Sequence, residues 1–389
     1  MLSERELSEH EAQLRLEQLC KSLGLHPKIE NLGDDDLVAS CVLHDATGNE
    51  LSSGAGKGRN CKLGALAECL EHHLSATPTP LSICSEVIVE SAKNLDDWLL
   101  LSLPPCSIPA FESEAADSDA RLYVPAALLA PEARIARQTG DTPAAFINKY
   151  SSNSGTALGC TENEALLHAI NEVIERHALS IYYLSLCNLT TPLKLFQPAP
   201  SLIKQAFSNH SELEDHSKDL KIYMSDTFYD TYFCIAIPSS SLPNELSVIG
   251  SGCSTDPSTA LYRAVTEQIQ CERLRSSKEL LEDEDTSVTL SKSKKLAALL
   301  HPLPNANYPS LHPSVKSYSV RQQIKRTLLN LKEYDRQVFY HVLFDEPGLA
   351  SVVQVYIPGL ERFHLIRSGI PVAPQSALSN GAREPHVHL

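Results

Sequence analysis

The 389-residue sequence has no apolar run of the roughly 18 residues that a membrane span needs. Its first six residues include three charged ones and form no apolar core of a secretory signal. Positive charge is also in short supply, because 48 acidic side chains against 33 basic ones give a net charge of −15. A non-specific nucleic-acid binder carries a basic surface. We therefore expect a cytoplasmic protein that binds neither a membrane nor nucleic acid.

Cysteine pairs with metal-ligand spacing are missing as well. Eleven cysteines are scattered between Cys20 and Cys271, and no two of them form a C-x-x-C motif. This pattern predicts reduced, mostly buried thiols and argues against a structural zinc site. We interpret Cys160 as a small buried residue, with a catalytic thiol as the alternative.

Common nucleotide-binding motifs are absent too. The sequence contains no G-x-x-x-x-G-K-[ST], no dinucleotide-binding G-x-G-x-x-G and no kinase signature set. Residues 52–58 hold three glycines and Lys57, but a surface turn explains this segment as well as a phosphate-binding loop does. No internal repeat of fixed period is present.

What the sequence does contain is an amphipathic helix pattern with an acidic side. At 100° per residue, Glu164, His168, Glu172 and Glu175 fall within about 80° of one another. Like charges at this spacing cost stability unless a cation lies near them. A solvated acidic face is the alternative, and for His168 a packed polar residue is favoured over a ligand or phosphate contact.

Two further features point to the same chemistry. The small-residue segment 151–159 precedes this helix and is expected to offer backbone N–H groups to an anion. A second predicted helix, about residues 61–75, carries Glu68, Glu71 and His72 on one stripe. His72 is as readily a packed polar residue as a ligand or phosphate contact.

A third helix is predicted to begin at Asp256-Pro257, because proline suits the first turn. Its offsets put four polar side chains on one face: Arg263, Glu267, Gln270 and Arg273. Carboxylate ligands without nearby soft ligands suit Mg²⁺, which takes a few carboxylates together with phosphates and water. Basic residues can balance a triphosphate. The sequence thus predicts a nucleotide site in which metal bridges carboxylates and phosphates.

Other chemistry is possible for such carboxylates. Ferritin-like bundles also bind metals through carboxylates, but they need an all-helical chain with E-x-x-H pairs. Here the pairs are E-x-x-E, and segments such as 37–43, 219–237 and 351–357 read as strands. A carboxylate-dimetal hydrolase without nucleotide stays open. The sequence favours a mixed α/β fold.

Four segments, in this order, resemble the YcaO superfamily. They are Gly56-Lys-Gly with Glu68-x-x-Glu71; Ser154-Gly-Thr-Ala-x-Gly-x-Thr-x-x-Glu164 with Glu172-Val-Ile-Glu175-Arg176; Asp256-Pro with Arg263-Ala-x-Thr-Glu-x-x-Gln270-x-x-Arg273; and Ile357-Pro-Gly-Leu-Glu361. They span about residues 50–365 of what we expect to be one YcaO-type domain over residues 1–389, with subdomains around a mixed β-sheet.

The resemblance implies an ATP- and Mg²⁺-dependent enzyme that acts on peptide backbone amides, with Glu68, Glu71, Glu164, Glu172 and Glu175 as metal ligands. Phosphate contacts would be Lys57, Arg176, Arg263, Gln270 and Arg273. In such enzymes a nucleophile adds to an amide carbonyl, and ATP phosphorylates the oxygen so that it can leave. No catalytic residue is assigned.

The product depends on the nucleophile. Cys, Ser or Thr side chains give azolines, sulfide gives a thioamide and an amine gives an amidine, in maturation of a ribosomally made peptide. Azoline formation is slightly favoured. The resemblance implies a precursor-peptide substrate, an E1-like, leader-peptide-binding or TfuA-like partner, and a homodimer or hetero-complex. An accessory role in ribosomal-protein β-methylthiolation is the alternative.

This chain departs from the family pattern at several positions. Gly64 and His72 stand where Ser and Arg are usual, and Cys160 stands where Asn is frequent. Only Arg5 and Ser8 are candidates for the nucleotide-contacting Lys and Ser near the N-terminus. The sequence ends without the Pro-x-Pro-x-Pro of many azoline-forming members, which puts azoline formation in question.

The remaining expectations concern polar segments. Residues 276–296 read as a mobile surface segment and residues 375–389 as a poorly packed tail. Asp34, Asp35 and Asp36 read as a solvated turn. The histidines of the tail, His386 and His388, read as disordered rather than as metal ligands.

Overall fold

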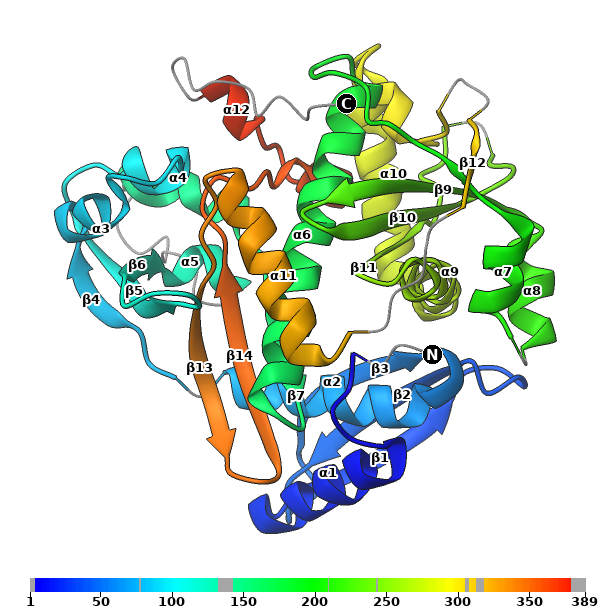
Figure 1. Ribbon diagram of the computed structural model, residues 1–389, viewed down its shortest axis with the longest axis horizontal. Coiled ribbons are helices and arrows are strands. Elements are labelled where there is room, and N and C mark those ends of the chain that lie inside the picture. The colour runs from blue at the N-terminus through cyan, green and yellow to red at the C-terminus, as the bar shows by residue number, and fades with distance from the viewer. Residues whose placement is uncertain are drawn as a thin grey trace.

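A computed structural model describes residues 4–76, 78–131, 143–208, 210–242, 244–304, 308–312 and 318–378. Three sheets and one long central helix make up its frame (Figure 1). The predicted tail histidines lie outside these residues. Within them, no helix is long and apolar enough to cross a membrane.

The N-terminal part is a three-stranded antiparallel sheet covered by helices. Its strands are β1 (His26–Asn31), β2 (Val38–His44) and β3 (Glu50–Lys57), paired in that order. Helices α1 (Glu9–Leu23) and α2 (Cys61–Ser75) supply buried residues to the core that lies against this sheet. A capping box of Ser8 and Glu11 starts α1, and Gly24 ends it at φ +67°.

The second sheet is the largest and lies beside α6, with β13 and β14 prominent in Figure 1. Its strand order is β4-β5-β13-β14-β7, with β6 pairing β5, and the pairs are antiparallel. The strands are β4 (Leu81–Cys84), β5 (Ser107–Ala115), β6 (Arg121–Pro125), β7 (Thr156–Gly159), β13 (Phe339–Glu346) and β14 (Ala350–Tyr356).

The third sheet, β11-β10-β9, lies on the other side of α6 (Figure 1). Its antiparallel strands are β9 (Leu220–Phe228), β10 (Thr231–Pro238) and β11 (Gly250–Ser254). Helix α9 (Pro257–Leu274) packs closely on β11, because a Cβ atom at Gly250 or Gly252 would meet the α9 backbone within 2.5 Å. Close packing between this strand and helix therefore requires glycine.

Helix α6 (Glu162–Leu186) is the central element and contributes to the largest hydrophobic core. Thr161 caps it by accepting a hydrogen bond from the Glu164 N–H at 3.2 Å. Sixteen of its 25 residues are buried, so a helix with this many polar residues is mostly internal. That burial brings its acidic stripe inside the molecule rather than into solvent.

The other elements are short or peripheral. The helices are α3 (Ser85–Ala92), α4 (Trp98–Leu101), α5 (Ala126–Leu129), α7 (Pro200–Ala206), α8 (Ser211–Ser217), α10 (Ser277–Ser291), α11 (Val320–Glu333) and α12 (Gln375–Leu378). Strands β8 (Gln197–Pro198) and β12 (Ser310–Leu311) form a parallel pair, and 3₁₀ turns are η1 (Gly58–Asn60), η3 (Pro143–Tyr150), η4 (Leu296–Leu299) and η5 (Phe363–Ser368).

Two segments differ from their sequence-based interpretation. The glycine-rich stretch before Lys57 is the end of strand β3 and not a loop, because glycine lets β3 approach α2; a Cβ at Gly56 would lie 1.8 Å from the Cys61 carbonyl oxygen. Most of segment 276–296 is the helix α10, started by a capping box of Ser276 and Glu279. Its acidic residues are largely exposed.

The predicted fold class is confirmed: the chain is a mixed α/β structure with several sheets. Residues 375–389 were expected to be a poorly packed tail, but the part that the structure describes, residues 375–378, is packed. Gln375 is buried, and its N–H donates a 3.0 Å hydrogen bond to Glu361. The carboxylate of Glu361 also accepts the Ser376 N–H at 2.7 Å. The chain is therefore anchored up to α12.

Candidate functional site

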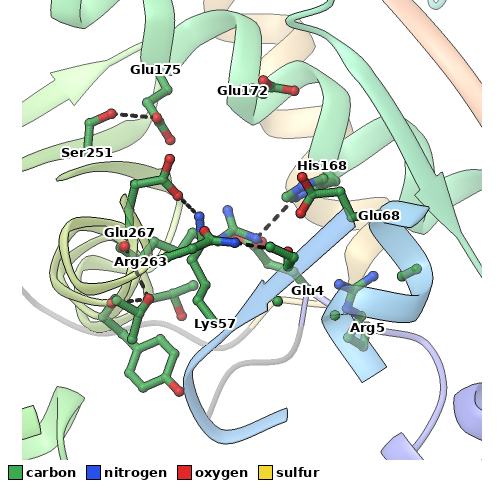
Figure 2. Close-up of a pocket in the computed structure, with 18 of the residues that line it drawn as sticks. Glu4, Arg5, Lys57, Glu68, His168, Glu172, Glu175, Ser251, Arg263 and Glu267 are labelled. Atoms are coloured by element: carbon green, nitrogen blue, oxygen red, sulfur yellow. Dashed lines mark hydrogen bonds and ion pairs between the residues drawn. The ribbon is translucent and has the colours of Figure 1, made fainter. Parts of the chain in front are cut away.

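Most of the predicted site residues meet at a cavity of about 970 Å³ between the N-terminal part, α6 and α9. Two acidic pairs far apart in sequence line the same space. Its charged lining includes Lys57, Glu68, Glu71, Glu172, Glu175, Arg176, Arg263 and Glu267, with the histidines His72 and His168. The predicted convergence of acidic side chains from α2 and α6 is thus present in the structure (Figure 2).

Backbone N–H groups of one short segment hold the carboxylates in place. Gly155 N–H donates to Glu172 at 3.1 Å, and Leu158 N–H donates to Glu71 at 2.8 Å. The sequence predicted that this segment would offer N–H groups to an external anion. These two N–H groups instead bind the protein's own carboxylates, so this part of the segment orients Glu71 and Glu172.

Burial and mutual repulsion leave these carboxylates in need of a cation. Burial raises the pKa of Glu71 well above its ordinary value, and the nearby Glu172 raises it further. Burial also raises the pKa of Glu172, against the opposing attraction of Arg176. The pKa of Glu68 is raised by burial as well. A bound divalent cation would stabilise the ionised form of each group.

Glu175 is already held by donors. Ser251 Oγ donates to Glu175 Oε1 at 2.7 Å, and Arg176 Nη1 lies 3.3 Å from the same oxygen. Arg176 Nη2 also lies 3.8 Å from Glu172 Oε1. Arg176 therefore bridges the two carboxylates of α6 and places a positive charge at the cavity wall.

The other cationic side chains of the cavity are paired with acids. Lys57 forms an ion pair with Glu267, and burial lowers the Lys57 pKa although Glu175 attracts its proton (Figure 2). Arg263 forms an ion pair with Glu4 and donates from Nη1 to the Cys253 carbonyl at 2.8 Å. Gln270 lines the cavity as predicted, but its amide donates to the Ala55 carbonyl at 2.9 Å.

Two predicted site residues do not line the cavity. Arg273 donates to Asp35 at 2.6 Å and to the Leu32 carbonyl at 3.0 Å, so it fastens the turn before β2. The aspartates of that turn were expected to be solvated, and for Asp35 this is wrong, because the two side chains form an ion pair. Arg273 is then not a phosphate contact.

Glu164 is the second such residue. Its side chain is only 1% exposed and accepts the N–H groups of Glu6, Leu7 and Cys160, the last two at 3.2 Å. A carboxylate engaged by three backbone donors on both oxygens has little capacity left for a metal ion. The structure thus gives Glu164 an anchoring role in place of the predicted ligand role.

The structure also shows where the remaining candidate residues lie. His168 lines the cavity, and burial together with Arg263 holds its pKa well below the ordinary value, so it is neutral near pH 7. His72 Nδ1 lies 2.7 Å from the Ser53 carbonyl and so carries its proton there. Ser8 caps α1, whereas Arg5 lines the cavity. Burial raises the Cys160 pKa to about 11, which supports the buried-thiol interpretation.

Sequence reasoning did not identify Glu4 or Ser251 as site residues. It also did not show that Glu267 would form an ion pair with Lys57. Glu4 lies in the cavity wall although it is 250 residues from its partner Ser254 and 259 from its partner Arg263 (Figure 2). An isolated Glu at the start of a chain carries no periodic signal. The helical spacing of Glu267 on the face of Arg263 did place it correctly.

The ligand side chains of the cavity suit Mg²⁺ better than a metal ion whose ligands all come from the protein. Among the described residues, no three His, Cys, Asp or Glu side chains gather closely enough to hold a metal unaided. Mg²⁺ usually takes one or two carboxylates and completes its shell with phosphates and water. Glu71 and Glu172, whose pKa values are raised, are the groups best suited to bind it. The fold and site therefore define a protein with a carboxylate- and cation-lined cavity suited to a metal–nucleotide complex.

A family model confirms this class. Residues 55–361 match the model described as YcaO cyclodehydratase, ATP- and Mg²⁺-binding. The match covers well over half of the chain, so this protein belongs to the YcaO family, and its cofactors are ATP and Mg²⁺. The family supports an ATP-dependent enzyme of the cyclodehydratase type.

Similar proteins agree with the fold. The YcaO of Methanopyrus kandleri, solved with AMPPCP and Mg²⁺, has a TM-score of 0.60 at 18% identity, covering 95% of this chain and 96% of that one. A heterocyclase in complex with substrate and cofactor has a TM-score of 0.62 at 16% identity over 92% of this chain. This chain spans 54% of that heterocyclase.

An E. coli microcin synthetase McbBCD complex with pro-MccB17 bound has a TM-score of 0.53 at 13% identity, covering 86% of this chain and 88% of that one. Among curated sequences, the uncharacterized protein MT1419 of Mycobacterium tuberculosis is 30% identical over 119 residues. That stretch is 30% of this chain and a quarter of the relative's length.

Proposed function

We propose that this protein uses ATP and Mg²⁺ to activate backbone amides of a ribosomally made peptide, with azoline formation as the reaction. The observation that carries the proposal is the convergence of Glu71 and Glu172 with Lys57, Arg176 and Arg263 on one cavity. Carboxylates hold a metal, and cations neutralise phosphates. The family description as a cyclodehydratase favours a ring-forming reaction over sulfur or amine incorporation.

The chemistry balances as a dehydration. The side-chain hydroxyl or thiol of Ser, Thr or Cys in the peptide adds through its oxygen or sulfur to the preceding carbonyl carbon and gives up its proton, and the C=O double bond becomes a C–O single bond. ATP supplies the phosphoryl group that turns the former carbonyl oxygen into a leaving group. Loss of phosphate and of the amide proton leaves the C=N bond of the ring, with ADP as the other product.

The residues of this chain bind and orient in that scheme. Glu71 and Glu172, which both line the cavity, would hold Mg²⁺, while the Leu158 and Gly155 N–H groups fix the direction of their carboxylates. Lys57, Arg176 and Arg263 would contact the phosphates. Binding that fixes geometry and neutralises charge is the main protein contribution in phosphoryl transfer.

A peptide substrate and a partner that delivers it are part of the proposal. The similar microcin synthetase is a complex of several chains with its peptide bound. We expect an E1-like, leader-peptide-binding or TfuA-like partner here, and a homodimer or a hetero-complex as the working assembly.

The test is co-expression of this chain with a candidate precursor peptide and partner, followed by mass spectrometry of the peptide. Azoline formation predicts the loss of one water per modified residue, mapped to Ser, Thr or Cys. Exchange of oxygen for sulfur would replace azoline by thioamide formation. Dehydration that joins an amine to a carbonyl would indicate an amidine. An unmodified peptide, with the Mg²⁺-dependent ATP binding retained, would favour the accessory role.

A further inference from the structure

The N-terminal segment, residues 4–7, reaches into the cavity through Glu4. The Glu4 side chain is only 9% exposed, and its carboxylate accepts hydrogen bonds from three elements. Ser254 Oγ of β11 donates at 2.5 Å, Asn171 Nδ2 of α6 donates at 3.2 Å, and Arg263 of α9 completes the set with an ion pair. A buried carboxylate with this many donors is firmly fixed.

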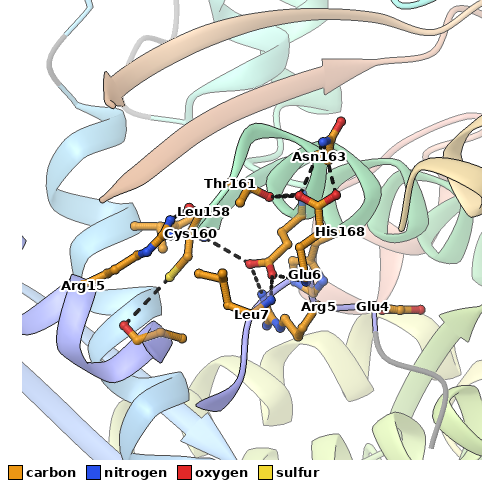
Figure 3. A network of polar contacts seen from close by, with 12 residues as sticks. Glu4, Arg5, Glu6, Leu7, Arg15, Leu158, Cys160, Thr161, Asn163 and His168 are labelled. Carbon is orange, nitrogen blue, oxygen red and sulfur yellow. Dashed lines mark hydrogen bonds and ion pairs between the residues drawn. The ribbon is translucent and has the colours of Figure 1, made fainter. Parts of the chain in front are cut away.

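The same segment is fastened at its middle by the first turn of α6 (Figure 3). Glu164 accepts the N–H groups of Glu6 and Leu7. In return, the Glu6 carboxylate accepts from Thr161 Oγ1 at 2.7 Å and from Asn163 Nδ2 at 3.3 Å. The anchoring of residues 6 and 7 limits where Glu4 can go and directs it to Arg263.

Glu4 determines how Arg263 presents its charge. One guanidinium nitrogen, Nη1, donates to the Cys253 carbonyl, and the other, Nη2, is shared between Glu4 and His168 Nδ1 at 3.4 Å (Figure 2). A neutral His168 can accept that contact. Without Glu4, the second nitrogen would lose its only charged partner among these contacts, and the side chain would gain rotamer freedom.

Glu4 does not need to leave for a ligand to enter. The cavity of about 970 Å³ is present with Glu4 bound in its wall. We propose that Glu4 is a positioning residue, which holds Arg263 in the orientation that binds nucleotide phosphate, and that the N-terminal segment is thereby part of the nucleotide site. This inference rests on the proposed function.

The test measures binding of ATP with Mg²⁺ to the full chain by calorimetry, using Glu4→Ala, Glu4→Gln, Arg263→Ala and the double variant Glu4→Ala/Arg263→Ala. We expect Glu4→Ala to weaken binding at least tenfold and Glu4→Gln to restore part of it, because an amide oxygen still accepts from Ser254. The double variant should bind no worse than Arg263→Ala alone, since Glu4 acts only through Arg263. Glu17→Gln, a change at a half-buried residue of α1 outside the cavity lining, is the matched control.

The outcomes distinguish a failure of the proposed function from a failure of the proposed role of Glu4. Wild-type protein that binds no ATP with Mg²⁺ would overturn the proposed function. Normal wild-type binding with unchanged affinity in Glu4→Ala would overturn only the role of Glu4. Tighter binding in Glu4→Ala would also overturn it and would make Glu4 a competitor of the nucleotide. Additive losses in the double variant would show that Glu4 does not act through Arg263. Circular dichroism and thermal melting of each variant verify that the fold persists.

Discussion

The N–H of Leu158 donates a 2.8 Å hydrogen bond to Glu71, a residue 87 positions earlier in the chain. Three residues before Leu158, Gly155 N–H binds Glu172 in the same way. One short backbone segment thus positions one carboxylate from each acidic helix. Because burial and the nearby Glu172 raise the pKa of Glu71, this arrangement is unfavourable without a cation and favours metal binding.

Glu172→Gln should weaken Mg²⁺-dependent ATP binding while leaving the fold intact. The amide oxygen can still accept the Gly155 N–H, but the side chain loses the charge that holds the metal. We expect binding to weaken by about tenfold to a hundredfold, comparable with the loss of a metal-site group. Calorimetric titration with ATP and Mg²⁺ measures this. Unchanged affinity together with an unchanged Mg²⁺ requirement would contradict the metal assignment.

The stability of the ligand-free protein should depend on pH through Glu71. Its folded-state pKa lies well above the ordinary value of 4.5, so the folded state keeps a proton that the unfolded state has released. This contribution to stability is complete below pH 4.5 and is lost as pH rises through the folded pKa, at about 1.4 kcal/mol per pH unit.

Glu71→Gln removes this titration and keeps an acceptor for Leu158. The variant should match wild type near pH 4 and become progressively more stable than wild type as pH rises, as measured by chemical denaturation across pH. The buried histidines have lowered pKa values, so their contribution to stability falls as the pH decreases, opposite to that of Glu71. Both proteins contain these histidines, so this contribution cancels when the two stabilities are subtracted. A constant difference at all pH values would contradict the raised pKa. At saturating ATP and Mg²⁺, wild type should instead be more stable than Glu71→Gln.

The sequence was most informative where chemistry follows helical periodicity. The spacing of Glu68 and Glu71 on α2, and of Glu172 and Glu175 on α6, correctly placed these residues on one cavity. Periodicity also put Arg273 on the same face of α9 as Arg263. It could not show that Asp35, from the turn between β1 and β2, would form an ion pair with Arg273. Pairings between distant segments depend on how the elements pack.

The same limit explains Glu164 and Glu4. Glu164 shares the acidic stripe, yet its position in the first turn of α6 places it under the backbone of the N-terminal segment. Sequence spacing could not show which carboxylate a returning chain would cover. The glycines of β3 were misleading for a related reason, because close packing of two backbones and phosphate binding both require residues without side chains.

Gly56→Ala should destabilise the protein without any change at a catalytic group. A Cβ atom there would lie 1.8 Å from the Cys61 carbonyl oxygen and 2.3 Å from the Ala65 nitrogen, both backbone atoms that cannot move aside independently. We expect a loss of about 1–3 kcal/mol or more, read as a lower unfolding midpoint in denaturant. Gly64→Ala is the milder comparison, since its nearest contact, the Gly56 Cα, is 3.3 Å away and alanine favours the helix. Equal stability of the two variants would contradict this packing.

Cys160→Ala should retain ATP binding with Mg²⁺ and, in the complete system, retain activity. The thiol is buried and its pKa of about 11 leaves almost no thiolate at neutral pH. Iodoacetamide should therefore fail to modify Cys160 in the folded protein at pH 7, as followed by peptide mass spectrometry. The exposed Cys84 provides the positive control for labelling. Rapid modification of Cys160, or loss of activity in the alanine variant with the fold intact, would support a catalytic thiol.

Glu164→Gln should separate an anchor from a metal ligand. The carboxylate accepts three N–H groups, whereas a glutamine side chain has one acceptor oxygen and an NH₂ group that faces a backbone donor. Leaving a buried donor unpaired should cost about 1–3 kcal/mol of stability. At saturating nucleotide, however, the Mg²⁺ concentration for half-maximal binding should equal that of wild type. Glu172→Gln, measured in parallel, should shift it upward. A similar upward shift in Glu164→Gln would return Glu164 to the metal site, because loosening of the N-terminal segment alone does not change the charge that binds the ion.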